Sequence, residues 1–86
     1  MLEFIYTNVI YPDSAKINNT EGMVVVNFII EKDGSISNAK ILREIGDGCG
    51  DEVVRVVESM PKWRPGIQRN ENVRVQMNLP VRFRLN

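Results

Sequence analysis

The stretch that decides the fold is residues 73–85, which read VRVQMNLPVRFRL. Apolar side chains at the odd positions alternate without a break with polar residues and one proline at the even positions. This period of two is typical of a β-strand with one buried face. At about 3.3 Å per residue the stretch would be roughly 43 Å long, longer than its partner strands, so we expect part of it to overhang.

Pro80 predicts that this strand lies at the edge of a sheet. Proline has no N–H to donate to a neighbouring strand, so within a sheet it is confined to an edge or a bulge. Backbone N–H and C=O groups alternate sides along a strand. If the backbone of Pro80 faces outward, the other even residues also face outward, and the odd residues pair with the central strand. The even positions would then offer unpaired backbone to another chain.

Two further strands are predicted upstream. Residues 23–31 are rich in β-branched and aromatic side chains, and apolar residues occupy both faces, which indicates either that both faces are at least partly covered or that this is the central strand. Asp33-Gly34 then predicts a tight turn, because these residues tolerate the positive φ that such turns require. We expect the return strand over residues 35–45, with a β-bulge near residues 37–38, where the apolar positions change parity.

Helices are predicted in two places. Residues 11–16 favour a short helical turn, since proline is tolerated in a first turn and Asp13 favours the positive end of the helix dipole. Apolar residues recur at helical spacing from Val53 to Met60, with Asp51 as the expected cap and Pro61 as the stop. A further turn is predicted over residues 70–72.

Length and composition favour one small globular domain that is not an enzyme. The 86 residues are 43% hydrophobic and 26% charged, and the apolar runs are far too short to span a membrane. The chain has no His and a single Cys49, which removes the commonest general base and the usual zinc ligands. We therefore predict no cofactor and no metal.

The glycine-rich loop over residues 46–50 precedes the second helix but lacks the Lys-Ser/Thr of a phosphate-binding loop. Asp47 within it would repel phosphate. We favour a flexible connection in which Cys49 is a small buried residue. Trp63 is expected in the core beneath the helix rather than in a peptide groove.

Charge is unevenly distributed along the chain. Residues 1–59 hold five basic and ten acidic residues, whereas residues 60–86 hold six basic residues and Glu71. A basic end is compatible with nucleic-acid binding, but aromatic stacking groups are not interleaved with the arginines. A solvated strand face is favoured, and no nucleic-acid partner is predicted.

The chain resembles the C-terminal domain of TonB, the energy transducer of Gram-negative bacteria, over about 75 residues. The matching segments are Tyr11-Pro12, residues 21–26, residues 33–36, Met60–Gly66 and Leu79–Phe83. The resemblance implies an α+β fold with a three-stranded antiparallel sheet and two helices packed on one face. It places this domain at residues 11–86, after an N-terminal extension at residues 1–10.

The resemblance also implies a periplasmic protein-binding function. In this family the domain binds the TonB box, a short extended segment of an outer-membrane transporter, and transmits force from an inner-membrane motor. The box adds as a strand to the last β-strand. Carried over to this chain, the partner-binding residues are Tyr11, Pro12, Val73, Arg74, Val75, Gln76, Met77, Asn78 and Leu79.

Several alternatives stay open from the sequence. The family's membrane anchor and Pro-rich spacer, through which the motor proteins are reached, are not found here, so we expect an excised domain or a soluble relative. Asn8 stands where the family often has a partner-contacting Gln. Tyr11 would either staple the first helix or face the docking strand. The exposed edge is also compatible with a homodimer or with a sensory interaction domain fused to a membrane receptor.

Overall fold

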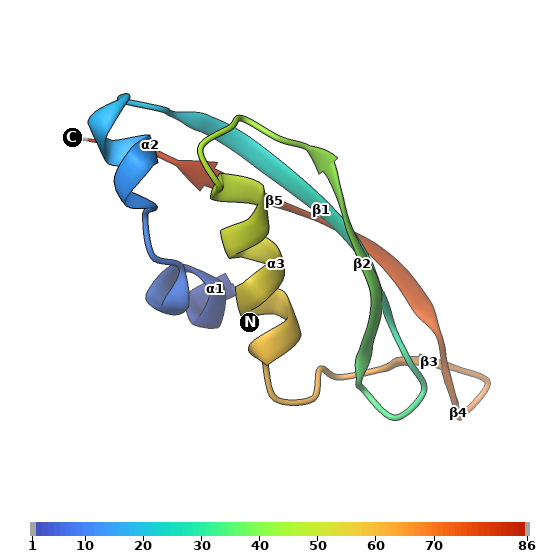
Figure 1. Ribbon diagram of the computed structural model, residues 1–86. Coiled ribbons are helices and arrows are strands. Elements are labelled where there is room, and N and C mark those ends of the chain that lie inside the picture. Colours follow the sequence, from blue (N-terminus) through green and yellow to red (C-terminus); the bar gives the residue numbers. More distant parts are fainter. Residues whose placement is uncertain (1, 86) are drawn as a thin grey trace.

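A three-stranded antiparallel sheet with helices on one face forms the fold (Figure 1). The computed structural model describes residues 2–85. The elements in chain order are α1 (Leu2–Asn8), α2 (Asp13–Ile17), β1 (Gly22–Ile30), β2 (Ile36–Arg43), α3 (Cys49–Ser59), β3 (Gly66–Gln68), β4 (Glu71–Val73) and β5 (Val75–Phe83). The sheet has the order β2-β1-β5, so the predicted α+β architecture is confirmed. Helix α1 was not predicted.

β1 is the central strand, as its composition predicted. Val24, Val26 and Phe28 are fully buried, and Val25 and Ile29 on the opposite face are half-buried. β1 pairs antiparallel with β2 on one side and with β5 on the other. A strand with neighbours on both sides needs apolar residues on both faces more than an edge strand does.

The turn between β1 and β2 forms at Asp33-Gly34. The Asp33 carboxylate accepts the backbone N–H of Ser35 at 2.9 Å, and Gly34 has a φ of +86°. A Cβ atom on Gly34 would lie 2.3 Å from the carbonyl oxygen of Trp63. Both the backbone conformation and this close approach require glycine.

β2 contains the bulge predicted near residues 37–38. Asn38 has a φ of +53°, and the register with β1 shifts at this point. A second register shift, between Val25 and Val26 of β1, was not predicted. β2 is therefore irregular along its length.

Helix α3 begins earlier than predicted, and Asp51 is not its cap. The N-cap is Gly48, in the left-handed region with a φ of +81°, and Asp51 lies inside the first turn. The Glu44 carboxylate, at the end of β2, accepts the backbone N–H of Gly50 at 2.9 Å and so satisfies a free donor of the first turn. The helix ends at Ser59, before Pro61, as predicted.

The core lies between α3 and the sheet. Val53, Val56 and Val57 of α3 are fully buried, and each such side chain contributes about 1.5–3 kcal/mol relative to exposure. Trp63 is 4% exposed and packs on Phe28 with ring centroids 5.1 Å apart. The expectation that Trp63 and Cys49 are buried is confirmed.

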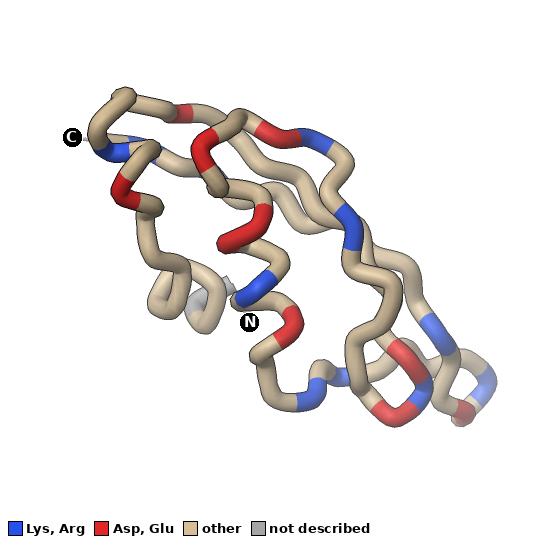
Figure 2. Tube along the Cα trace, in the orientation of Figure 1, with Lys and Arg blue, Asp and Glu red and all other residues tan. Residues whose placement is uncertain are grey.

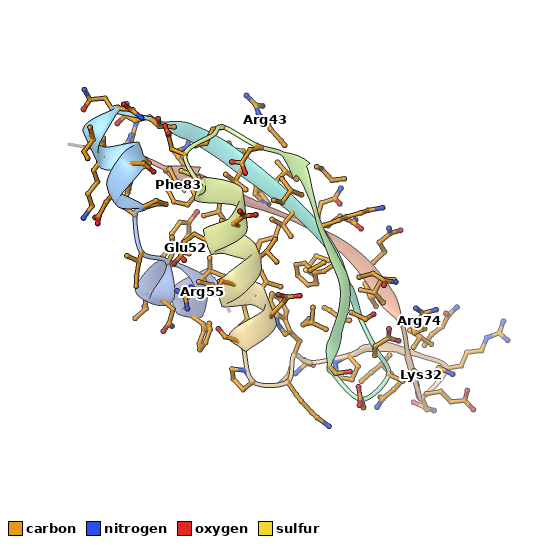
Figure 3. All side chains as sticks on the ribbon, viewed as in Figure 1. Lys32, Arg43, Glu52, Arg55, Arg74 and Phe83 are labelled. Carbon is orange, nitrogen blue, oxygen red and sulfur yellow. The ribbon has the colours of Figure 1, made fainter. Side chains whose placement is uncertain are left out.

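Two hydrogen bonds between its backbone and side chains of α3 attach the N-terminal segment to this helix, and an ion pair within α3 joins the two side chains (Figure 3). Glu52 accepts the backbone N–H of Ile10 at 2.6 Å and pairs with Arg55 at 2.7 Å, and Arg55 donates to the carbonyl oxygen of Asn8 at 3.2 Å. Ile5 of α1 is fully buried in the core. Within residues 2–85, none of the helices has the length and apolar character that a membrane span requires.

Candidate docking edge

β5 lies at an edge of the sheet, as Pro80 predicted. It pairs with β1 along its whole length, from Val75 opposite Ile30 to Phe83 opposite Gly22. β2 lies on the far side of β1, so no strand of the described chain pairs with the outer side of β5. The outer side of residues 73–79 is called the docking edge below.

The position of Pro80 fixes which backbone groups face outward. Pro80 lies opposite Val25, and without an N–H it cannot complete a hydrogen-bonded pair. Because the two kinds of pair alternate in an antiparallel ladder, the hydrogen-bonded pairs are those of the neighbouring odd residues. The even residues therefore direct their backbone groups away from β1. Their exposed side chains are those of Gln76, Asn78, Pro80 and Arg82.

The alternating stretch is not one continuous strand, which corrects the sequence prediction. It divides at Arg74, and β4 before it pairs with β3 in a separate two-stranded sheet. The turn between them is formed by Arg69 and Asn70, with φ values of +53° and +66°, one residue earlier than predicted. Two positive φ values in a two-residue loop are typical of a type I′ hairpin. The predicted overhang is thus paired locally with β3.

This hairpin leaves the docking edge free. Gln68 and Glu71 flank the two-residue loop and form a hydrogen-bonded pair in such hairpins, as does the pair of Gly66 and Val73 two residues further on. The odd residues of β4 therefore direct their backbone N–H and C=O groups toward β3. In the same way, the odd residues of β5 direct theirs toward β1. The outward direction of the even residues continues from β5 to the start of β4.

Arg74, which is labelled in Figure 3, forms an ion pair with Glu31 that the sequence did not predict. Its Nε lies 2.7 Å from Oε1 of Glu31, and the Ser37 hydroxyl donates to the same carboxylate. The hydrogen bond from Ser37, and then that from Arg74, hold the pKa of the Glu31 carboxyl below its usual value. The charge of Arg74 is therefore balanced before any partner binds. The register of β5 on β1 explains this pair. Ile30 lies opposite Val75, so the next residues, Glu31 and Arg74, also lie opposite each other.

Tyr11 and Pro12 lie away from the rest of the predicted site. The Tyr11 ring packs edge-on against Phe83 with centroids 5.3 Å apart, and its hydroxyl donates to the carbonyl oxygen of Thr20. Phe83 is at the opposite end of β5 from Val75. Pro12 is the N-cap of α2. These contacts hold α2 in place, which is one of the two roles expected of Tyr11.

Comparison with known proteins shows the family. The sequence model of the family described as Gram-negative bacterial TonB protein C-terminal matches residues 7–85. This chain belongs to that family. An NMR solution structure of Helicobacter pylori TonB-CTD is 24% identical, with a TM-score of 0.69, and the match covers 94% of this chain and 85% of that one. A second H. pylori TonB-CTD structure is 22% identical, with a TM-score of 0.63, covering 99% and 78%. These two likenesses confirm the fold. A comparison with curated proteins finds no match.

Two carboxylates, that of Glu44 before the loop and that of Asp47 within it, anchor the glycine-rich loop of this TonB C-terminal domain. Glu44 occupies the position at the start of α3 where an anion would bind, since it accepts the Gly50 N–H. The carboxylate of Asp47 accepts hydrogen bonds from Asn18, at 3.1 Å, and from the Thr20 hydroxyl. The loop therefore joins α2 to α3. In residues 2–85 no group of three or more His, Cys, Asp or Glu is placed to hold a metal ion.

The other edge of the TonB-type sheet, β2, is less regular than β5. Its register with β1 shifts twice, and Asn38 has a left-handed backbone. Bulges blunt an edge because they interrupt the regular row of donors and acceptors. β5 pairs with β1 without a shift, so its outer side is the more regular template.

Basic residues are spread along the whole molecule and are interspersed with acidic ones (Figure 2). Among the described residues, the ion pairs are Arg55–Glu52, Lys62–Asp33 and Arg74–Glu31. Arg82, at the far end of β5 from Arg74, joins none of these pairs. The basic residues of the C-terminal segment are thus spread over the connection after α3, the β3–β4 hairpin, Arg74 and the C-terminal end of β5, and Arg82 is the one that lies within β5.

Proposed function

We propose that this domain is the periplasmic partner-binding domain of a TonB-like energy transducer. It binds the TonB-box segment of an outer-membrane transporter by β-strand addition along β5, and it transmits force from an inner-membrane motor to drive substrate import. The proposal rests on membership of the TonB C-terminal family and on one observation, the unpaired outer side of β5.

The geometry supports strand addition over a short segment. Arg74, Gln76 and Asn78 direct their backbone groups outward, and Pro80 ends the run because it offers no donor. A partner segment of about five residues, roughly 17 Å long, would match this run. In this mode main-chain hydrogen bonds supply affinity, and alternate side chains supply selectivity.

The alternating direction of the backbone allows a sharp test. Gln76→Pro removes an outward donor and should abolish binding of a synthetic TonB-box peptide, taken from a transporter encoded in the same genome, while the domain stays folded. Met77→Pro removes an inward donor to β1 and should unfold the domain, because proline in a ladder position breaks the pairing. Gln76→Thr keeps the backbone N–H and is the control for loss of the side chain.

Fluorescence anisotropy of the labelled peptide measures binding, and circular dichroism measures folding. Normal binding by Gln76→Pro would show that the outward and inward residues are assigned the wrong way round. A folded Met77→Pro variant would show the same error independently of any peptide.

A second candidate is a homodimer formed through the same edge. The unpaired backbone of β5 that suits a partner strand also suits the β5 strand of a second copy. Sedimentation velocity over a range of protein concentrations separates the two candidates. A monomer at all concentrations would remove the homodimer.

A further inference from the structure

Asn27 is out of place in β1 by its chemistry. β1 reads GMVVVNFII, in which Asn27 interrupts a run of apolar residues, and asparagine is depleted in strands. Asn27 is 6% exposed, and among residues 4–85 no other polar residue is buried. A residue that breaks the local pattern in a sheet is expected to have a functional or structural reason.

The side chain of Asn27 binds the side chains of two docking-edge residues. Its Nδ2 donates to Oδ1 of Asn78 at 2.7 Å, and its Oδ1 accepts from Nε2 of Gln76 at 3.1 Å. Asn27 and Asn78 lie directly opposite each other in the ladder. Because Asn78 faces outward, this is a non-hydrogen-bonded pair, the kind in which opposing side chains come closest. Gln76 is its diagonal neighbour.

The helices cover one face of the sheet (Figure 1). These three amides lie on the other face, because Asn27 alternates along β1 with Val26 and Phe28, which are buried in the core. They border a hollow of about 340 Å³ whose other lining residues are Lys40 and Leu42. Without Asn27, the side chains of Gln76 and Asn78 would have room to turn. Nothing else in the described chain hydrogen-bonds their amides.

A released amide at these positions would compete for the docking edge. Asparagine side chains readily hydrogen-bond their own or neighbouring backbone groups, and the nearest unpaired groups are the outward N–H and C=O of Gln76 and Asn78. A partner strand would have to displace these bonds. It would also have to order two side chains that are now already ordered, which weakens binding.

We propose that Asn27 is a positioning residue that keeps the docking edge open. Its side chain holds the amides of Gln76 and Asn78 on the open face of the sheet, away from the backbone groups that receive the partner strand. The consequence for peptide affinity rests on the proposed function, whereas the effect on the backbone of β5 does not.

The first test needs no partner. In Asn27→Val, hydrogen exchange at the outward N–H groups of Gln76 and Asn78, followed by NMR, should slow roughly 2- to 10-fold relative to wild type, as expected for one new local hydrogen bond. Valine is chosen because it suits a strand whose neighbours are apolar. Asn27→Thr is the second variant should valine prevent folding. Unchanged exchange at both groups would overturn the proposal.

The second test is a cycle of binding measurements with the TonB-box peptide. In the wild-type background, Asn27→Val should weaken binding of the peptide roughly 5- to 30-fold, because the two released amides of Gln76 and Asn78 compete with the peptide for the backbone groups. In the Gln76→Thr/Asn78→Thr background, which has no amides to release, the same change should cost less than about 2-fold. A purely structural role of Asn27 would give equal losses in both backgrounds, and that result would overturn the proposal.

The two tests separate the two ideas. If wild type does not bind the peptide but exchange slows in Asn27→Val, the proposed function fails and the role of Asn27 stands. If wild type binds and Asn27→Val changes neither exchange nor affinity, the role of Asn27 fails and the proposed function stands.

Discussion

Gly34→Ala should destabilise the domain by more than the turn conformation alone explains. Gly34 has a φ of +86°, and a left-handed backbone costs an L-residue about 1–2 kcal/mol. A Cβ atom there would lie 2.3 Å from the Trp63 carbonyl oxygen, so the turn and Trp63 must separate. That movement strains the hydrogen bond from the Trp63 N–H to the Gly34 carbonyl, now 2.8 Å, whose loss costs about 0.5–1.5 kcal/mol. The free energy of unfolding should fall by about 1.5–3.5 kcal/mol in total.

Gly46→Ala is the matched control for this prediction. Gly46 has a φ of +99°, but a Cβ atom on it would meet nothing within 4 Å. Gly46→Ala should therefore lower the free energy of unfolding by the conformational cost alone, about 1–2 kcal/mol, because its Cβ atom makes no close contact. Urea denaturation followed by circular dichroism measures both variants. If the two variants unfold at the same urea concentration, the close approach to Trp63 has no energetic effect and the reasoning is refuted.

Three further predictions concern the core, an ion pair and a helix cap. Trp63→Ala should lower the free energy of unfolding by about 3–5 kcal/mol, because a ring that is 4% exposed leaves a cavity; an unchanged thermal unfolding curve would contradict this. Glu31→Gln should destabilise the domain near neutral pH but not in strong acid. The pKa of the Glu31 carboxyl is lowered from its ordinary value of 4.5 on folding, so its contribution is present above that value and is lost as the pH falls through the folded-state pKa. Urea denaturation near neutral pH and in strong acid measures this difference, and an equal loss of stability under both conditions would contradict the prediction. Glu44→Ala should cost about 1 kcal/mol through the lost cap at Gly50, and Asp51→Ala should cost less; a greater loss of thermal stability in Asp51→Ala would contradict this assignment.

An unpaired strand edge is a hazard for a folded protein, and this domain limits it in several ways. Pro80 interrupts the row of donors, and β3 covers the inner side of β4. The polar and charged side chains of the even residues also discourage pairing with unrelated strands. Between the β3–β4 hairpin and Pro80, the short run from Arg74 to Asn78 remains open, and it is long enough for the partner strand that we propose.

Local patterns in the sequence determined β1, β2, β5 and the turn between β1 and β2. The alternation over residues 73–85 predicted the buried face of β5, and Pro80 predicted both its edge position and its outward residues. Asp33-Gly34 predicted the hairpin, and the change of parity predicted the bulge at Asn38. Each of these depends on the backbone preferences of a few neighbouring residues, so a short window of sequence contains the information.

Only the tertiary structure decided which distant side chains meet. Asn27 binds Asn78 across 51 residues of sequence, and Arg74 binds Glu31 across 43. The contact of Tyr11 with Phe83 likewise joins the two ends of the chain. The first two of these pairs follow from the register of β5 on β1, which all the strand pairs and the burial of one face set together. No local window contains that register, so the residues that position the docking edge came into view only in the folded chain.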